Sequence, residues 1–86
     1  MRLMVEFTTE PFELDAFPDH AAAARRVVDE AGLEVTVGPF GTSATGEAER
    51  VMAAVTRLLH DSLEAGANRI SFQVSVLPAG EEVDAP

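Results

Sequence analysis

The stretch Leu3-Met4-Val5-Glu6-Phe7-Thr8 decides how this chain is expected to fold. Apolar and polar side chains alternate along it, which is the pattern of a β-strand with one buried face. The same alternation returns at residues 33–38 and 70–77, and a shorter strand is expected over residues 42–45. Pro11 ends the first strand, because proline cannot donate a hydrogen bond to a neighbouring strand.

Two helices are expected between these strands. In the first helix, apolar residues recur at helical spacing within residues 18–32. In the second, a broader apolar stripe runs through residues 51–63, and Thr45 or Gly46 is expected to be the N-cap of this helix. The resulting order, β-α-β-β-α-β, predicts a ferredoxin-like α+β sandwich: a four-stranded antiparallel sheet with both helices on one face. We expect one domain over residues 1–77, followed by a mobile acidic tail over residues 78–86.

Strand alternation assigns the side chains to the two faces of this sheet. The apolar set expected to meet the helices is Leu3, Val5, Phe7, Val35, Val37, Ile70, Phe72, Val74 and Val76. The other face would carry Met4, Glu6, Thr8, Glu34, Thr36, Ser71, Gln73 and Ser75, with either Thr42 or Ser43. Two interpretations stay open, a solvated face and a sheet-to-sheet dimer that encloses a polar pocket. In the second, Glu6 and Gln73 converge on one ligand, because the first and last strands are neighbours in this topology.

The composition of the chain excludes several classes of partner and of functional site. With 6 basic and 15 acidic residues the net charge is −9, which disfavours nucleic acids and anionic membranes as partners. The chain has no cysteine, which excludes disulfides, thiol catalysis and Cys-type zinc sites. Its longest uncharged stretch, residues 35–46, has 12 residues, fewer than the roughly 20 that a membrane helix needs. The N-terminus lacks a secretory pattern, so we expect a cytoplasmic protein.

No pattern of catalytic residues stands out. His20 and His60 lie on different expected helices without ligand-type spacing, so no metal site or cofactor is predicted. No nucleophile–base pair or phosphate-binding glycine motif is visible, and we therefore expect a protein that is not an enzyme. Three of the five phenylalanines, Phe12, Phe17 and Phe40, fall in loops, where they either cover the core or form a stacking wall for a flat or cationic ligand.

Four short motifs resemble a known family. They are Val5-Glu6-Phe7-Thr8 with Pro11, Gly38-Pro39-Phe40-Gly41-Thr42, Gly46-Glu47 before Val51-Met52, and Ala65-Gly66-Ala67-Asn68-Arg69-Ile70-Ser71. In this order the chain resembles the small thiamine-binding proteins, a YkoF-like group that binds thiamine or its hydroxymethylpyrimidine moiety. The resemblance spans residues 3–77. It departs at Ser75-Val76-Leu77-Pro78, where many members have a segment of mixed charge, and at Phe40, where many have methionine.

The resemblance implies a non-catalytic binding protein, with a thiamine-type ligand at or near a subunit interface of a homodimer or tetramer. Its role would be that of a carrier, buffer or sensor. Combined with the polar sheet face, it predicts ligand-binding residues Glu6, Thr8, Thr36, Phe40, Thr42, Ser71 and Gln73. The alternative is a structural or regulatory oligomerisation domain without a small-molecule ligand.

Overall fold

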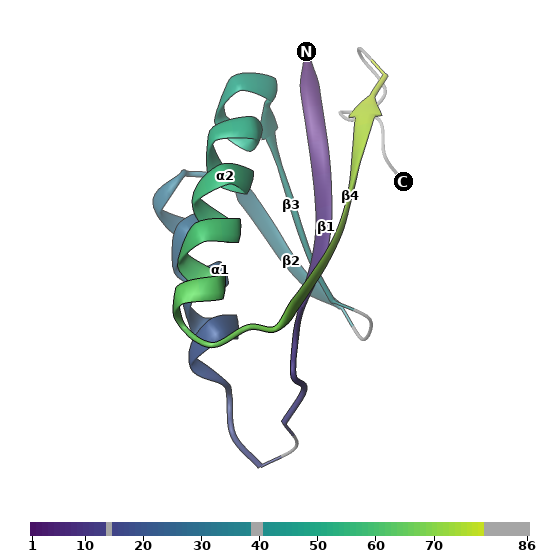
Figure 1. Ribbon diagram of the computed structural model, residues 1–86. Helices are drawn as coiled ribbons and strands as arrows, with labels where there is room; N and C mark the ends of the chain where they lie inside the picture. Colours follow the sequence, from purple (N-terminus) through teal and green to yellow (C-terminus); the bar gives the residue numbers. More distant parts are fainter. Residues whose placement is uncertain (14, 39–40, 79–86) are drawn as a thin grey trace.

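The chain forms one antiparallel sheet with two helices on one side (Figure 1). This computed structural model describes residues 1–13, 15–38 and 41–78. Its elements are β1 (Arg2–Glu10), α1 (Asp19–Glu30), β2 (Glu34–Gly38), β3 (Gly41–Glu47), α2 (Ala48–Glu64) and β4 (Arg69–Leu77). The order of elements confirms the predicted ferredoxin-like sandwich. The expected mobile tail lies outside the described residues, apart from Pro78.

The sheet has the strand order β2-β3-β1-β4, and all three pairings are antiparallel. Strand β1 is central, and it pairs with β3 on one side and along its whole length with β4 on the other. Consequently β2 and β4 are the two edges of the sheet. They differ in length, five residues in β2 and nine in β4.

The core lies between β1, β3 and the two helices. Its buried residues are Leu3, Val5, Phe7, Ala24, Val27, Val28, Leu33, Ala44, Ala48, Val51, Ala54 and Leu58. Small side chains let the layers approach closely here. At Gly46, for example, an added Cβ would lie 2.6 Å from the Leu33 side chain.

The second helix begins later than predicted. Gly46 belongs to β3, and Glu47 is the N-cap residue of α2, without a side-chain capping hydrogen bond. The expectation of Thr45 or Gly46 as the cap was therefore wrong. Pairing with β1 extends β3 to Glu47, because the Arg2–Glu47 pair still belongs to the ladder.

The helices do not cover the whole apolar face. Both pack against β1, with α1 also touching β2 and α2 also touching β3, whereas β4 lies beyond them. Phe72, Val74 and Val76 therefore stay exposed on the helix side of the sheet. Val37 is exposed at the opposite edge. The prediction that these four residues lie on the helix side is correct, as the pairing of Val74 with Val5 shows. The prediction that the helices cover them is wrong.

Candidate ligand-binding site

One row of polar residues crosses the uncovered face of the sheet. Thr36 on β2 lies opposite Ser43 on β3, Ser43 lies opposite Glu6 on β1, and Glu6 lies opposite Gln73 on β4. Residues directly opposite each other project to the same face, with Cβ atoms about 4.5–5.5 Å apart. The carboxylate of Glu6 and the amide of Gln73 are therefore neighbours, halfway along β1 and β4, as predicted.

This row borders a hollow of about 610 Å³ that is open on one side. That volume is in the range of small-molecule sites, about 300–1,000 Å³. The described residues that line it are Glu6, Phe7, Thr8, Thr36, Gly38, Gly41, Thr42, Ser43, Ser71, Phe72 and Gln73. Thr8 and Ser71, which are also directly opposite each other, extend the polar surface by a second row.

Glycine at position 41 lets two strands come close at the rim of the hollow. Its φ is +146°, and a Cβ there would lie 2.8 Å from both the Phe7 carbonyl oxygen and the Thr8 side chain. A larger residue would push β3 away from β1 next to Thr8. Gly41 thus controls the shape of this end of the site.

The hollow brings together six of the seven residues that the sequence predicts for it. They are Glu6, Thr8, Thr36, Thr42, Ser71 and Gln73. Phe40 lies outside the described residues. Phe12 and Phe17 are both exposed and do not line the hollow, so neither covers the core.

The register decides between Thr42 and Ser43. Thr42 lies opposite Phe7 and Val37, and so has the parity of the helix side, whereas Ser43 lies opposite Glu6. Thr42 nevertheless lines the hollow. Ser43 belongs to the polar row, but it is missing from the ligand-binding residues predicted from the sequence. Ala44 is fully buried, which assigns the neighbouring Ser43 to the other face.

The charges around the hollow favour a cation. Arg2 contacts Glu34 at 3.0 Å, and Arg69 lies 3.8 Å from Glu10, so each arginine on this face has an acidic partner. Within the described residues, Glu6 has no ion-pair partner. Its negative charge is thus free to act on a bound molecule, in a protein whose net charge is −9.

Both histidines lie away from the hollow and have structural partners. His20 is buried, with Nδ1 2.8 Å from the Thr9 hydroxyl and Nε2 2.9 Å from the Pro11 carbonyl oxygen. The carbonyl can only accept, so Nε2 carries a proton. The contacts of His20 hold the end of β1 against the start of α1.

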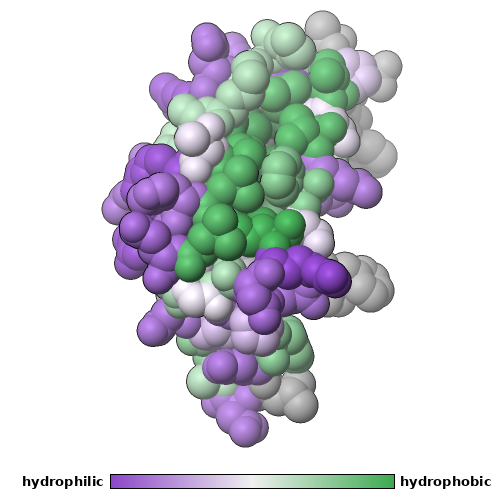
Figure 2. Space-filling model, viewed as in Figure 1, coloured by the Kyte–Doolittle hydropathy of each residue, from purple (hydrophilic) through white to green (hydrophobic). Residues whose placement is uncertain are grey.

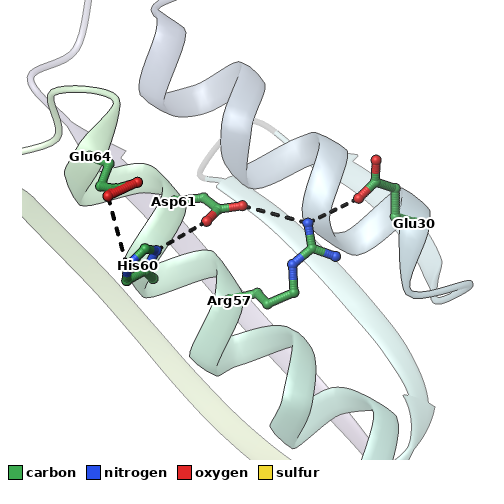
Figure 3. A network of polar contacts seen from close by, with 5 residues as sticks. All are labelled: Glu30, Arg57, His60, Asp61 and Glu64. Atoms are coloured by element: carbon green, nitrogen blue, oxygen red, sulfur yellow. Dashed lines mark hydrogen bonds and ion pairs between the residues drawn. The ribbon is translucent and has the colours of Figure 1, made fainter.

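His60 belongs to a surface network that joins the two helices (Figure 3). In this network Arg57 on α2 donates a hydrogen bond of 3.0 Å to Glu30 on α1 and lies 3.6 Å from Asp61. The bond to Glu30 raises the pKa of Arg57 above its usual value, and Asp61 adds to this effect. The network is exposed and joins the two helices, and none of its residues lines the hollow.

Solved structures define the class of the fold. A domain of unknown function from Bacillus cereus is 22% identical, with a TM-score of 0.67 over 91% of this chain and 78% of that one. An acylphosphatase from Coxiella burnetii is 17% identical, with a TM-score of 0.57 over 90% of this chain and 84% of that one. At these identities the likeness concerns the fold alone, and it places the chain among ferredoxin-like sandwiches.

The family follows from the sequence match. A model of the thiamine-binding protein family matches residues 5–82, so the chain belongs to that family. A Thermotoga maritima protein provisionally assigned to thiamine biosynthesis or salvage is 25% identical, with a TM-score of 0.53 over 98% of this chain and 97% of that one. No curated protein sequence matches the chain. Among the described residues, neither helix has the length and apolar character required to span a membrane.

Proposed function

We propose that this protein binds thiamine or its hydroxymethylpyrimidine moiety in the hollow on the polar sheet face, without a chemical step. The observation that carries the proposal is the direct opposition of Glu6 and Gln73 beside the hollow. Family membership supplies the class of ligand. The proposed role is that of a carrier, buffer or sensor.

The two ends of thiamine match the chemistry of the lining. Thiamine carries a thiazolium cation, which the carboxylate of Glu6 would attract. Its aminopyrimidine ring has adjacent donor and acceptor edges, and the Gln73 amide offers both kinds of group. The hydroxyls of Thr8 and Ser71 offer further partners in the next row. Because a polar site penalises ligands that leave its groups unpaired, this set would discriminate well between related molecules.

The open side of the hollow fits a site that a second subunit completes. One face of the ligand would lie on the sheet, and the opposite subunit would exclude water from the other. We therefore propose that the ligand lies at or near a subunit interface, as the family resemblance implies. A mass by light scattering and the stoichiometry of binding together test this placement.

Calorimetric titration with thiamine, thiamine diphosphate and hydroxymethylpyrimidine tests the function. We expect thiamine to bind and the diphosphate to bind more weakly, because its phosphates meet a protein of net charge −9. Equal or tighter binding of the diphosphate contradicts the role of Glu6. If none of the three binds, the alternative of an oligomerisation domain without a ligand replaces the proposal.

A further inference from the structure

The polar row across the sheet has a fixed order of chemical groups. From β4 to β2 it passes an amide, a carboxylate and two hydroxyls, which belong to Gln73, Glu6, Ser43 and Thr36. Neighbouring strands lie about 4.7–4.9 Å apart, so these groups are evenly spaced over the width of the sheet. All four residues line the hollow. The carboxylate, which would attract a cation, therefore has an amide on one side and hydroxyls on the other.

The hollow extends to both sides of Glu6 across the strands, but to only one side of it along them. Towards the end of β1, Thr8 also lines the hollow. In the other direction the next residue on this face is Met4, with Thr45 and Ser75 as its cross-strand neighbours, and none of these three lines the hollow. A molecule with a cation at its middle thus has room on both sides of Glu6 only if it lies across the strands.

The other side of β4 is apolar. Val74 and Val76 lie on the opposite face of this strand from Gln73, and both are exposed. Figure 2 shows a hydrophobic area there, between the positions of α2 and β4 in Figure 1. A ligand ring with hydrogen-bonding groups that reaches β4 is therefore expected on the polar face, beside Gln73.

Ser43 has a hydroxyl group that is only weakly engaged within the protein. Its Oγ lies 3.5 Å from the Thr36 carbonyl oxygen, farther than in an ordinary hydroxyl hydrogen bond of about 2.5–3.0 Å. Since a hydroxyl rotates to suit its partner, this group can turn to a ligand at little cost. Ser43 is also the half-buried member of the row, so a hydrogen bond made there is partly shielded from water.

We propose that thiamine lies across the strands, with its aminopyrimidine ring at Gln73, its thiazolium ring at Glu6 and its hydroxyethyl group at Ser43 and Thr36. This inference rests on the proposed function and adds which end of the ligand each residue contacts. In thiamine the cationic ring lies between the aminopyrimidine ring and the alcohol, which is the order of the groups along the row. Ser43 and Gln73 are thus specificity-determining residues for opposite ends of the ligand.

The chemistry of the two ends favours this direction over the reverse. The planar amide of Gln73 presents a donor beside an acceptor, as the edge of the aminopyrimidine ring does, whereas a hydroxyl can both donate to and accept from an alcohol. In the reverse direction the planar ring would meet two rotating hydroxyls on separate strands. Hydroxymethylpyrimidine, which lacks the thiazolium ring and its hydroxyethyl group, would use only the Gln73 end of the row.

The test compares Ser43→Ala and Gln73→Ala in calorimetric titrations with three ligands. They are thiamine, hydroxymethylpyrimidine and the thiamine analogue in which an ethyl group replaces the hydroxyethyl group. Ser43→Ala should weaken the binding of thiamine about 3- to 10-fold, as expected for one neutral hydrogen bond, and change the affinity for the other two ligands less than about 2-fold. Gln73→Ala should weaken the binding of all three. Ser75→Ala, on the same face but outside the lining, is the control and should change none.

Three outcomes would overturn the inference while the proposed function stands. Ser43→Ala could bind thiamine as tightly as the wild-type protein does, could lose as much affinity for the ethyl analogue as for thiamine, or could lose affinity for hydroxymethylpyrimidine while Gln73→Ala keeps it. If the wild-type protein does not bind thiamine at all, the proposed function fails together with the inference.

NMR of the wild-type complex gives a measurement that needs no substitution. Nuclear Overhauser effects should connect the pyrimidine protons of thiamine with the Gln73 side chain, and its hydroxyethyl protons with Ser43 or Thr36. The opposite connections would mean that the ligand lies in the reverse direction, and connections of both rings with β1 and β4 alone would mean that it lies along the strands.

Discussion

Strands β1 and β4 have the same length and the same alternation of apolar and polar residues, yet the helices bury only one of them. Val5 on β1 and Val74 on β4 lie directly opposite each other, but the first is 1% exposed and the second 48%. A strand pattern thus assigns a side chain to a face, and the placement of the helices decides whether that face is covered. On the polar face the two strands instead act together, through Glu6 and Gln73.

The largest expected effect concerns the covered side of β1. Val5→Ala should lower the free energy of unfolding by about 2–4 kcal/mol, because the buried side chain leaves a cavity in the core. Val74→Ala should cost about 1 kcal/mol, since half of that side chain is already in water. Chemical denaturation of both variants at one protein concentration measures the difference. Equal losses would mean that β4 is as well covered as β1.

The next effect concerns the polar side of β1. Glu6→Gln keeps the shape of the side chain and removes its charge, so thiamine should bind about 1.5–3 kcal/mol more weakly, the usual value of a charge-assisted hydrogen bond. Stability should hardly change, because the chain is already rich in acids. Calorimetry and thermal melting measure the two quantities.

Glu34→Gln is the matched control for that variant. It removes the same charge from the same face, but Glu34 lies opposite Thr45 and outside the lining of the hollow. Its affinity for thiamine should stay within about 0.5 kcal/mol of the wild-type protein. If Glu34→Gln weakens binding as much as Glu6→Gln does, the general acidity of the protein and not the Glu6 site attracts the ligand.

A smaller effect is expected where β1 ends. His20→Ala should lower the free energy of unfolding by about 1–2 kcal/mol, because it leaves the Thr9 hydroxyl and the Pro11 carbonyl without their partner. The control is His60→Ala, whose side chain lies on the surface and should contribute far less. Thermal and chemical denaturation give both values. If His20→Ala lowers the free energy of unfolding as little as His60→Ala does, contacts other than those of His20 hold the end of β1 in place.

The smallest effect falls on the polar side of β4. Gln73→Ala should weaken thiamine binding by about 0.5–1.5 kcal/mol, since its amide offers a neutral hydrogen bond in place of a charged one. Ser75 is the control, because it is on the same strand and face but does not line the hollow. Calorimetry on Gln73→Ala and Ser75→Ala compares them. Unchanged affinity in both Gln73→Ala and Glu6→Gln would move the site away from this face.

The sequence alone determined the order of the elements, the two faces of the sheet and most of the residues around the hollow. Alternation along β1 and β4 was enough to place Glu6 and Gln73 side by side, because a ferredoxin-like topology makes these strands neighbours. The sequence did not establish which of Thr42 and Ser43 lies on the polar face, because this depends on the register of β3 against β1.

Only the tertiary structure decided which apolar side chains are covered. Phe72, Val74 and Val76 follow the same period-two pattern as Leu3, Val5 and Phe7, and the local sequence contains nothing that separates the two sets. The difference comes from where α1 and α2 lie on the sheet, over β1, β2 and β3. Burial depends on contacts between segments far apart in the chain, whereas alternation is a property of one strand by itself.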